Sequence, residues 1–296
     1  MERTLNKAAV DIGTNSARLL VVSPEGEVER RQMVTGLGRG LSETGLAEDS
    51  VDRTVAALER YGQLICEWKV TAARAVATSA VRDAPNREAF LDRAEKALGF
   101  RPETIGGAEE ATLSFSGAVG ELSDPENCMV VDIGGGSTEL VWRNTEGTIR
   151  AVSLQLGSVR MTESVLGDRP PPRSQLQAAF AQSGEALGEV SLPLRSRVVG
   201  VAGTWTSLAA IGLGLRTYDR RRVHHSTMTS AQMAILLAEL AKLTIAETAA
   251  IPSLDPARAP VLLAGAVIAH ESLRRLACTE VLISESDLLD GIIASL

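Results

Sequence analysis

Hydrophobic and polar positions divide this chain into short apolar runs that alternate with longer segments of helical period. Runs bounded by glycine, proline or charged residues predict strands, at residues 8–22 (two strands), 27–34, 72–80, 101–107, 129–142 (two strands), 148–154, 197–203 and 280–284. Apolar residues three or four apart predict helices, at residues 49–68, 86–98, 108–119, 158–166, 174–188, 203–211 (a loop, then a helix), 229–241, 256–276 and 286–295. This alternation predicts an α/β protein whose mixed sheets are covered by helices.

A glycine-rich turn joins two of these strands at residues 132–139, with the sequence D-I-G-G-G-S-T-E. Three glycines exceed the need of an ordinary hairpin, and their N–H groups can converge on phosphate oxygens because no Cβ obstructs the approach. We therefore expect the turn to bind phosphate, through Gly134, Gly135, Gly136 and Ser137. Asp132 and Glu139 offer carboxylates that can hold Mg²⁺. The alternative is a tight hairpin with a β-bulge.

The same frame, V-D-I-G-x-x-S, occurs near the N-terminus, in residues 10–16. Asp11 and Gly13 mirror the acid and the first glycine of the other turn. Asn15, Ser16 and Arg18 carry donors that can hydrogen-bond phosphate oxygens. A hairpin with a polar turn explains this segment equally well in isolation, and it is the repeat that favours phosphate binding.

The repeated strand–turn–strand opening predicts two related domains, at residues 1–121 and 122–296. We expect a cleft between them, and a terminal helix near 286–296 that packs back on the first domain. This is the architecture of the actin, hexokinase and heat-shock-70 superfold, in which facing glycine turns hold phosphates.

Two further segments place polar groups at helix starts. A strand ending in A-T-S-A-V-R (77–82) carries Arg82, whose guanidinium can contact phosphate in a bidentate manner. An exposed loop arginine is the common alternative. The helix start G-G-A-E-E-A (106–111) offers two carboxylates, one of which can act as the base for a water aimed at phosphorus. Simple N-terminal capping competes with that interpretation, because the helix dipole stabilises anions there.

A third anion site at a helix start is predicted in V-A-G-T-W-T-S (201–207), against the alternative of a turn capped by Thr204 or Thr206. The run Y-D-R-R-R-V-H-H-S (218–226) is the most basic segment of the chain. Arg221 and Arg222 suit a phosphate chain, although such a run is usually a solvated loop.

Charge and composition exclude several classes of protein. A net charge of −7 over 296 residues disfavours a nucleic-acid surface, yet permits a local site for a small polyanion. No run of about 18 apolar residues exists, so we expect no membrane span. Three dispersed cysteines and an N-terminus without an apolar signal core favour the cytoplasm. Only three histidines occur, which disfavours histidine-based metal or nucleophile chemistry.

Seven motifs in order resemble the exopolyphosphatase/guanosine pentaphosphate phosphohydrolase family: D-I-G-T-N-S-A-R, A-T-S-A-V-R-D-A, G-G-A-E-E-A, D-I-G-G-G-S-T-E-L-V, L-G-S-V-R-M-T-E, V-A-G-T-W-T-S-L-A and Y-D-x-x-R-V-H. The resemblance runs from residue 8 to about 226 and more loosely to the end. It also covers residues 37–54, which have no interpretation of their own. Several positions depart from the family pattern, at His225, Pro260, Asp287 and Leu289.

The resemblance implies two actin-like or acetate-kinase-like (ribonuclease H-like) domains in a short form without an added helical domain. It implies Mg²⁺-dependent (or Mn²⁺-dependent) removal of terminal phosphate from inorganic polyphosphate or guanosine pentaphosphate, by a homodimer. It makes Glu110 the catalytic glutamate, and assigns Asp11, Asp132 and Glu139 to the metal network. Arg82, Asn15, Ser137 and Gly134–Gly136 are assigned to phosphate.

Two other functions stay open at the level of sequence. One is a phosphotransferase of the same superfold that uses ATP, against which no sugar-recognition motif is evident. The other is a non-catalytic sensor that binds guanosine tetraphosphate or polyphosphate.

Overall fold

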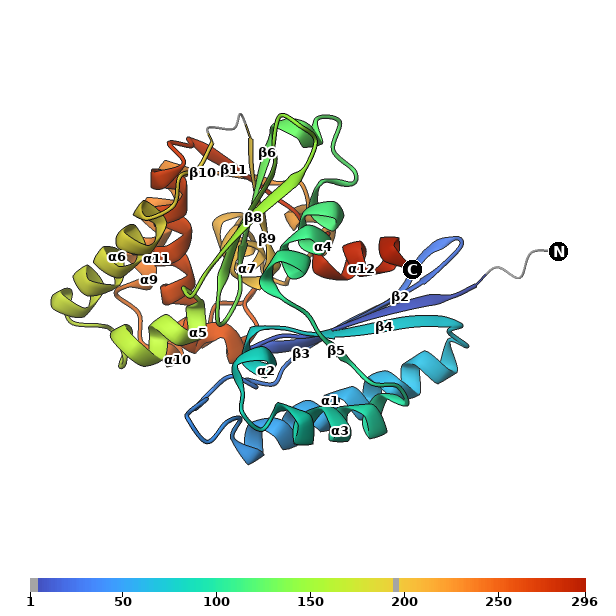
Figure 1. The fold of residues 1–296 in the computed structure, drawn as a ribbon. Helices are drawn as coiled ribbons and strands as arrows, with labels where there is room; N and C mark the ends of the chain where they lie inside the picture. Colours follow the sequence, from blue (N-terminus) through green and yellow to red (C-terminus); the bar gives the residue numbers. More distant parts are fainter. Residues whose placement is uncertain (1–4, 194–196) are drawn as a thin grey trace. The chain divides into compact units, whose positions relative to one another are not determined.

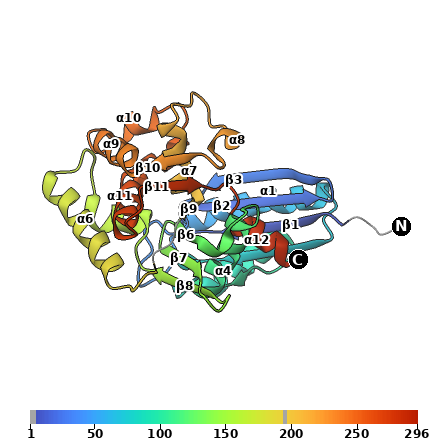
Figure 2. The same ribbon diagram turned by 90° about the horizontal axis from the view of Figure 1, so that it is seen from above.

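The computed structural model describes residues 5–193 and 197–296 and divides into two compact units. The first unit comprises the chain up to Gly117 together with Leu288–Leu296, and the second comprises Ala118–Asp287. Each unit has its own mixed sheet and its own helices (Figures 1 and 2).

The sheet of the first unit has the order β3-β2-β1-β4-β5. Its strands are β1 (Lys7–Ile12), β2 (Ser16–Ser23), β3 (Gly26–Val34), β4 (Ala72–Ala77) and β5 (Glu103–Thr104). The first three strands form an antiparallel meander, whereas β4 runs parallel to β1 and β5 parallel to β4. This is the strand order of a ribonuclease H-like sheet.

Helices cover both faces of this sheet, as the alternation of its residues requires (Figure 1). Ala8, Val10 and Ile12 of β1 pack on one face with α1 (Glu48–Glu67) and α3 (Arg87–Leu98). Ala9 points to the other face, where α4 (Gly107–Val119) and α12 (Leu288–Ser295) contribute buried leucines. A short helix, α2 (Ser79–Asp83), follows β4.

The second unit repeats the strand order and adds one edge strand, giving β10-β11-β9-β6-β7-β8. Its strands are β6 (Cys128–Ile133), β7 (Thr138–Arg143), β8 (Ile149–Leu154), β9 (Arg197–Val201), β10 (Thr227–Thr229) and β11 (Glu280–Ile283). Again three antiparallel strands are followed by two parallel crossovers, from β6 to β9 and from β9 to β11. The predicted α/β, actin-like class of two related sheets is confirmed, whereas the predicted cleft stays a prediction.

The helices of the second unit are α5 (Ser158–Met161), α6 (Arg173–Gly188), α7 (Ala202–Gly212), α8 (Arg220–Val223), α9 (Ser230–Leu240), α10 (Ile245–Ala249) and α11 (Ala259–Arg275). A π-helical turn (Thr162–Leu166) follows α5, and single 3-10 turns lie at Pro125–Asn127 and Pro256–Arg258. Helix α11 is the centre of the unit, because it packs against α6, α7 and α9 and is buried along nearly its whole length (Figure 2). No helix in the described ranges is long and apolar enough to cross a bilayer.

The predicted loop before the helix at 203–211 is wrong, because α7 begins directly at Ala202 after β9. Ala202 makes the sharp change of direction with a φ of 67°, a conformation that is rare for residues other than glycine. The pattern also missed α8, β10 and α10, which are too short to show a period.

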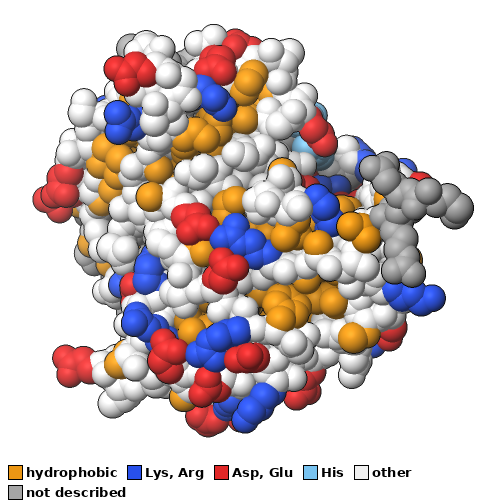
Figure 3. Space-filling model, turned by 45° about the vertical axis from the view of Figure 1, so that its right-hand side comes forward, with side chains coloured by type: hydrophobic (Ala, Val, Ile, Leu, Met, Phe, Trp, Pro, Cys, Tyr) orange, Lys and Arg blue, Asp and Glu red, His pale blue; other side chains and the backbone are white. Residues whose placement is uncertain are grey.

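Arginines of the first unit contact carboxylates. Arg93 of α3 lies 2.6 Å from Glu48 and 2.5 Å from Asp52 of α1, and Arg101 donates to three carboxylates of α3. On the face drawn in Figure 3, blue and red side chains lie next to one another without a broad basic band. Most of the positive charge on this face is therefore locally balanced.

Helix α12 is held in the first unit by apolar packing and one ion pair. Leu289, one of the positions that depart from the family pattern, is 1% exposed and packs with Leu288 and Ile292 against the sheet. Asp290 pairs with Arg30 of β3 at 2.9 Å. Gly291 lies so close to α4 that a Cβ there would be 1.9 Å from the carbonyl oxygen of Leu113.

We expect Gly291→Ala to destabilise the protein by about 1–3 kcal/mol, because α12 must shift away from α4 and this loss exceeds the gain in helix propensity. The measurement is the midpoint of urea denaturation. Gly188→Ala is the matched control: it lies at the end of α6 with open space around its Cβ position, and should be neutral or slightly stabilising. Equal midpoints for the two variants would contradict the close contact between α4 and α12.

Candidate active-site groups

The glycine turn of the second unit presents three backbone N–H groups in one direction. Its carbonyls are all used on the side of α5: Gly134 O accepts from Ser158 N at 3.0 Å, Gly135 O from Val159 N at 2.9 Å, and Gly136 O from Arg160 Nε at 3.0 Å. In a trans peptide the N–H points opposite to the C=O. The N–H groups of Gly135, Gly136 and Ser137 therefore point away from α5.

A close contact behind the turn requires glycine in the neighbouring L-G-S-V-R segment, since a Cβ at Gly157 would lie 2.3 Å from Gly135 O. The turn itself is closed by Gly134 N donating to Ser137 O at 3.0 Å. Strands β6 and β7 pair in continuous register up to the turn, without the β-bulge of the alternative interpretation. Phosphate binding by the turn stays a prediction.

The first unit contains the same turn with different chemistry beside it. Gly13 N donates to Ser16 O at 3.0 Å, as Gly134 does in the second unit. Asp11 lies directly opposite Arg18 in the β1–β2 register, and Arg18 Nη2 is 2.7 Å from Asp11 Oδ2. Asp11, assigned by the resemblance to the metal network, is thus beside a cation in this structure.

The corresponding pair of the second unit consists of two acids. Asp132 lies directly opposite Glu139 in the β6–β7 register, and both side chains are buried. Directly opposed residues share one face of the sheet, with Cβ atoms about 5 Å apart. Ser153 donates to Glu139 Oε1 at 2.7 Å. This set of hard carboxylate oxygens fits Mg²⁺ better than the Asp11–Arg18 pair does.

The two glutamates at the start of α4 have different surroundings. Glu110 is 12% exposed, and its Oε2 lies 3.3 Å from Arg82 Nη1, which also donates to the carbonyl of Ile105. Glu109 is 49% exposed and pairs with Arg74 at 2.6 Å. Only Glu110 therefore lies beside a predicted phosphate-binding arginine.

Residues 35–38, which lead into the stretch 37–54 that had no interpretation, hold the first glycine turn in place. The carbonyl of Asn15 accepts from the N–H groups of Thr35 and Gly36, both at 3.0 Å, and Gly38 N donates to Thr14 O at 2.8 Å. Thr78 N, just before α2, donates to Ile12 O at 3.1 Å. The segments that carry Asn15, Ser16 and Arg82 are thus tied to one end of β1.

Arg258, which the sequence analysis did not single out, packs against the start of α7. The guanidinium of Arg258 packs against Gly203 so closely that a Cβ there would lie 1.7 Å from Arg258 Nη1. Thr204 donates to Ile133 O at 3.1 Å, and no side chain caps α7. Capping by Thr204 or Thr206 is therefore wrong, and Arg258 adds positive charge at this helix start.

Pro260 occupies the first turn of α11, where proline is tolerated.

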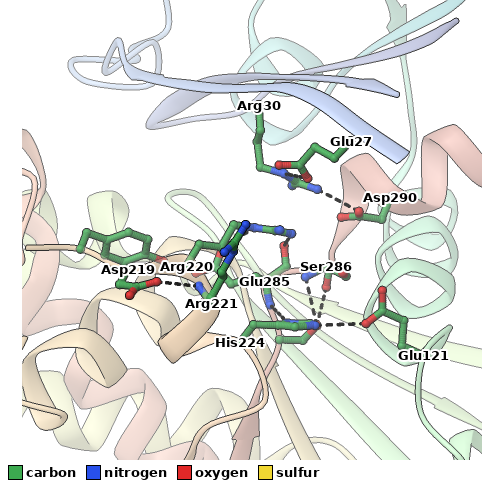
Figure 4. Close-up of polar contacts among 12 residues, drawn as sticks. Glu27, Arg30, Glu121, Asp219, Arg220, Arg221, His224, Glu285, Ser286 and Asp290 are labelled. Carbon is green, nitrogen blue, oxygen red and sulfur yellow. Dashed lines mark hydrogen bonds and ion pairs between the residues drawn. The ribbon is translucent and has the colours of Figure 1, made fainter. Parts of the chain in front are cut away.

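The basic run is a short helix beside an open hollow of about 800 Å³. The hollow is lined by Gly214, Arg216, Thr217, Tyr218, Asp219, Arg220, Arg221 and Arg222. Asp219 caps α8 by accepting from Arg221 N at 3.0 Å (Figure 4). The run thus forms one wall of the hollow as a short helix, with Arg221 and Arg222 exposed to solvent.

His225, one of the positions that depart from the family pattern, has a φ of 59°. That left-handed conformation is uncommon for residues other than glycine. The His225 ring stacks on His224 at 3.7 Å between ring centroids. Burial lowers the pKa of His225, and neighbouring His224 lowers it further.

Comparison with known proteins defines the class to which these two sheets and their glycine turns belong. Residues 26–296 match the Ppx/GppA phosphatase family, and the chain belongs to this family. The prediction of an enzyme that hydrolyses phosphoanhydride bonds is thereby confirmed.

Individual relatives span the whole chain. It is 38% identical to a Mycobacterium tuberculosis protein named exopolyphosphatase 2, over 98% of both chains. The crystal structure of an exopolyphosphatase-like protein is 33% identical, with a TM-score of 0.93 over 98% of each chain. The Aquifex aeolicus member of the Ppx/GppA family is 32% identical, with a TM-score of 0.82 over 98% of this chain and 97% of its own.

Proposed function

We propose that this chain is an exopolyphosphatase that removes the terminal phosphate from inorganic polyphosphate with Mg²⁺ bound. The observation that carries the proposal is the row of three N–H groups, from Gly135 to Ser137, next to the paired carboxylates of Asp132 and Glu139. Relatives named exopolyphosphatase support polyphosphate as the substrate. Guanosine pentaphosphate ends in the same terminal phosphoanhydride, so the same groups suit it as a second substrate.

Each group has a role in phosphoryl transfer, whose transition state is loose and carries charge on the equatorial oxygens. The N–H groups of the second glycine turn stabilise those oxygens. Arg82, Arg221 and Arg222 each neutralise phosphate charge. Glu110 orients the attacking water and accepts its proton, the bond between phosphorus and the bridging oxygen breaks, and the shortened polyphosphate leaves.

Asp132 and Glu139 are the residues that would hold Mg²⁺, because two buried acids side by side are stabilised by a cation between them. Bound there, Mg²⁺ supplies positive charge to the phosphate oxygens. Cytoplasmic placement is part of the proposal and is supported by three free thiols, at Cys66, Cys128 and Cys278.

A phosphate-release assay tests the proposal, with polyphosphates of defined length and guanosine pentaphosphate, each with and without Mg²⁺. We expect Mg²⁺-dependent release of orthophosphate. Tight binding of the same compounds without any release would instead indicate the non-catalytic sensor, and ATP-dependent transfer to a small acceptor would indicate the phosphotransferase.

We expect higher kcat/KM on short polyphosphates than on chains of hundreds of units. Long chains need basic surface spaced along their path, but the net charge is −7 and arginines such as Arg93 and Arg101 are paired with acids. The basic hollow at Arg216–Arg222 holds only a few phosphates. Added salt should weaken short-chain binding only modestly, since few charges are neutralised.

The measurement is kcat/KM across sized polyphosphates at a fixed concentration of terminal phosphate. Molecular mass in solution is the control, because a homodimer would offer two basic hollows to one chain. A steady rise of kcat/KM with length would contradict the expectation.

A further inference from the structure

Glu285 lies in the rigid turn between β11 and α12, at the start of the segment that departs from the family pattern. The turn is fixed by Ser284, whose hydroxyl donates to Ser286 O at 2.8 Å and accepts from Ser286 N at 3.1 Å. Ser284 N also donates to Gly200 O of β9 at 2.9 Å. The backbone that carries Glu285 is therefore anchored to the sheet of the second unit.

The Glu285 side chain contacts two residues that line the basic hollow. Its carboxylate accepts a hydrogen bond from the Tyr218 hydroxyl and lies 3.5 Å from Arg220 Nε. Its backbone carbonyl accepts from Arg220 Nη2 at 3.3 Å. The carboxylate is only 11% exposed, so it is largely removed from competing water. Desolvation of the Tyr218 hydroxyl, and then the charge of Glu285, raise the pKa of Tyr218, which stays a hydrogen-bond donor.

The backbone N–H of Glu285 fixes the next residue of the wall. It donates to His224 Nδ1 at 3.0 Å, so neutral His224 carries its proton on Nε2, 3.2 Å from Glu121 Oε2. Glu121, His224 and His225 lie close enough to suggest a metal site. The tautomer argues against one, because one His224 nitrogen accepts a hydrogen bond and the other holds a proton. These contacts instead hold the segment 218–225 to the turn at Glu285.

We propose that Glu285 is a positioning residue: its contacts with Tyr218 and Arg220 hold the wall of the basic hollow in the form that takes the internal phosphates of a linear polyphosphate. This inference rests on the proposed function for its substrate class. The Glu285 carboxylate has a second effect of opposite sign, because it cancels part of the positive charge of Arg220. A loss of affinity when Glu285 is replaced therefore indicates positioning, whereas a gain indicates that Glu285 only neutralises Arg220.

Two substitutions separate the effects. Glu285→Asp keeps the charge but withdraws the carboxylate by about 1.5 Å, whereas Glu285→Gln keeps the length and removes the charge. If Glu285 positions the wall, Glu285→Asp raises KM for short polyphosphate by about three- to tenfold, the worth of one or two hydrogen bonds, with kcat within about twofold of the parent. The Gln variant still accepts the hydrogen bond from Tyr218 but loses the charge that attracts Arg220, so its KM does not fall below that of the parent. If it only neutralises Arg220, the Asp variant matches the parent and the Gln variant has a lower KM, which would overturn the proposal.

Tyr218→Phe removes the same hydrogen bond from the other side without altering charge. We expect it to weaken binding as well, and to add little further loss in combination with Glu285→Asp, because both changes break the contact between Tyr218 and Glu285. Full additivity, or unchanged affinity in both single variants, would overturn the proposal. Glu280→Gln, an exposed position on β11 away from the hollow, is the control for net charge.

Calorimetric binding of sodium tripolyphosphate to each variant keeps this test separate from the proposed function. A protein that releases no phosphate, yet binds tripolyphosphate through Glu285-dependent contacts, would overturn the hydrolytic proposal and support the positioning role. If hydrolysis is normal but the affinity for tripolyphosphate does not depend on Glu285 or Tyr218, the positioning role is overturned and the hydrolytic proposal is supported.

Discussion

Glu110→Gln should lower kcat by about 100-fold or more while leaving substrate affinity and stability nearly unchanged. The amide keeps the size of the side chain and still accepts a hydrogen bond from Arg82, but it cannot accept a proton from water. The position is well fixed, since Glu110 is 12% exposed and 3.3 Å from Arg82. The measurement is single-turnover phosphate release, together with a tripolyphosphate binding isotherm.

Glu109→Gln is the matched control, one residue away on the same helix turn. Its carboxylate is half exposed and already paired with Arg74, and loss of such a pair has little effect. We expect this variant to retain activity within about threefold of the parent. Equal losses in the two variants would mean that both acids only stabilise the start of α4.

Asp132→Asn should raise the Mg²⁺ concentration for half-maximal activity by about tenfold or more, because a neutral amide is a poorer ligand for a hard cation. The opposed Glu139 remains, so residual binding at high Mg²⁺ is expected. A titration of activity against Mg²⁺ measures the effect.

Asp11→Asn provides the comparison from the other glycine turn. Because Asp11 faces Arg18 at 2.7 Å, we expect it to shift the Mg²⁺ requirement less than Asp132→Asn does. The reverse order, or an unchanged requirement in Asp132→Asn, would place the principal metal ligands in the first unit.

The repeat of V-D-I-G-x-x-S was sufficient to predict two sheets of one kind, because the same local pattern imposes the same turn. In both units the first glycine N–H closes on the serine carbonyl at 3.0 Å. The chemical difference between the turns depends on register, which places Arg18 opposite one acid and Glu139 opposite the other. The family resemblance assigned both acids to the same metal network.

Groups that act through distant contacts could not be predicted in this way. Arg258 lies 55 residues after Gly203 in the chain, and Glu285 lies 67 residues after Tyr218. No local pattern connects either pair, since each contact depends on how the crossovers order β9 and β11. The short α8 has the same limitation, because a four-residue helix has no period to detect.

The most direct test of the central claim uses phosphorus NMR, with Mg²⁺ present, to follow the products formed from a polyphosphate of one defined length. If this chain removes terminal phosphates, orthophosphate appears from the start, each remaining chain is one unit shorter, and Glu110→Gln abolishes both signals. Orthophosphate-free cleavage into internal fragments, or equal release by Glu110→Gln, would contradict the account.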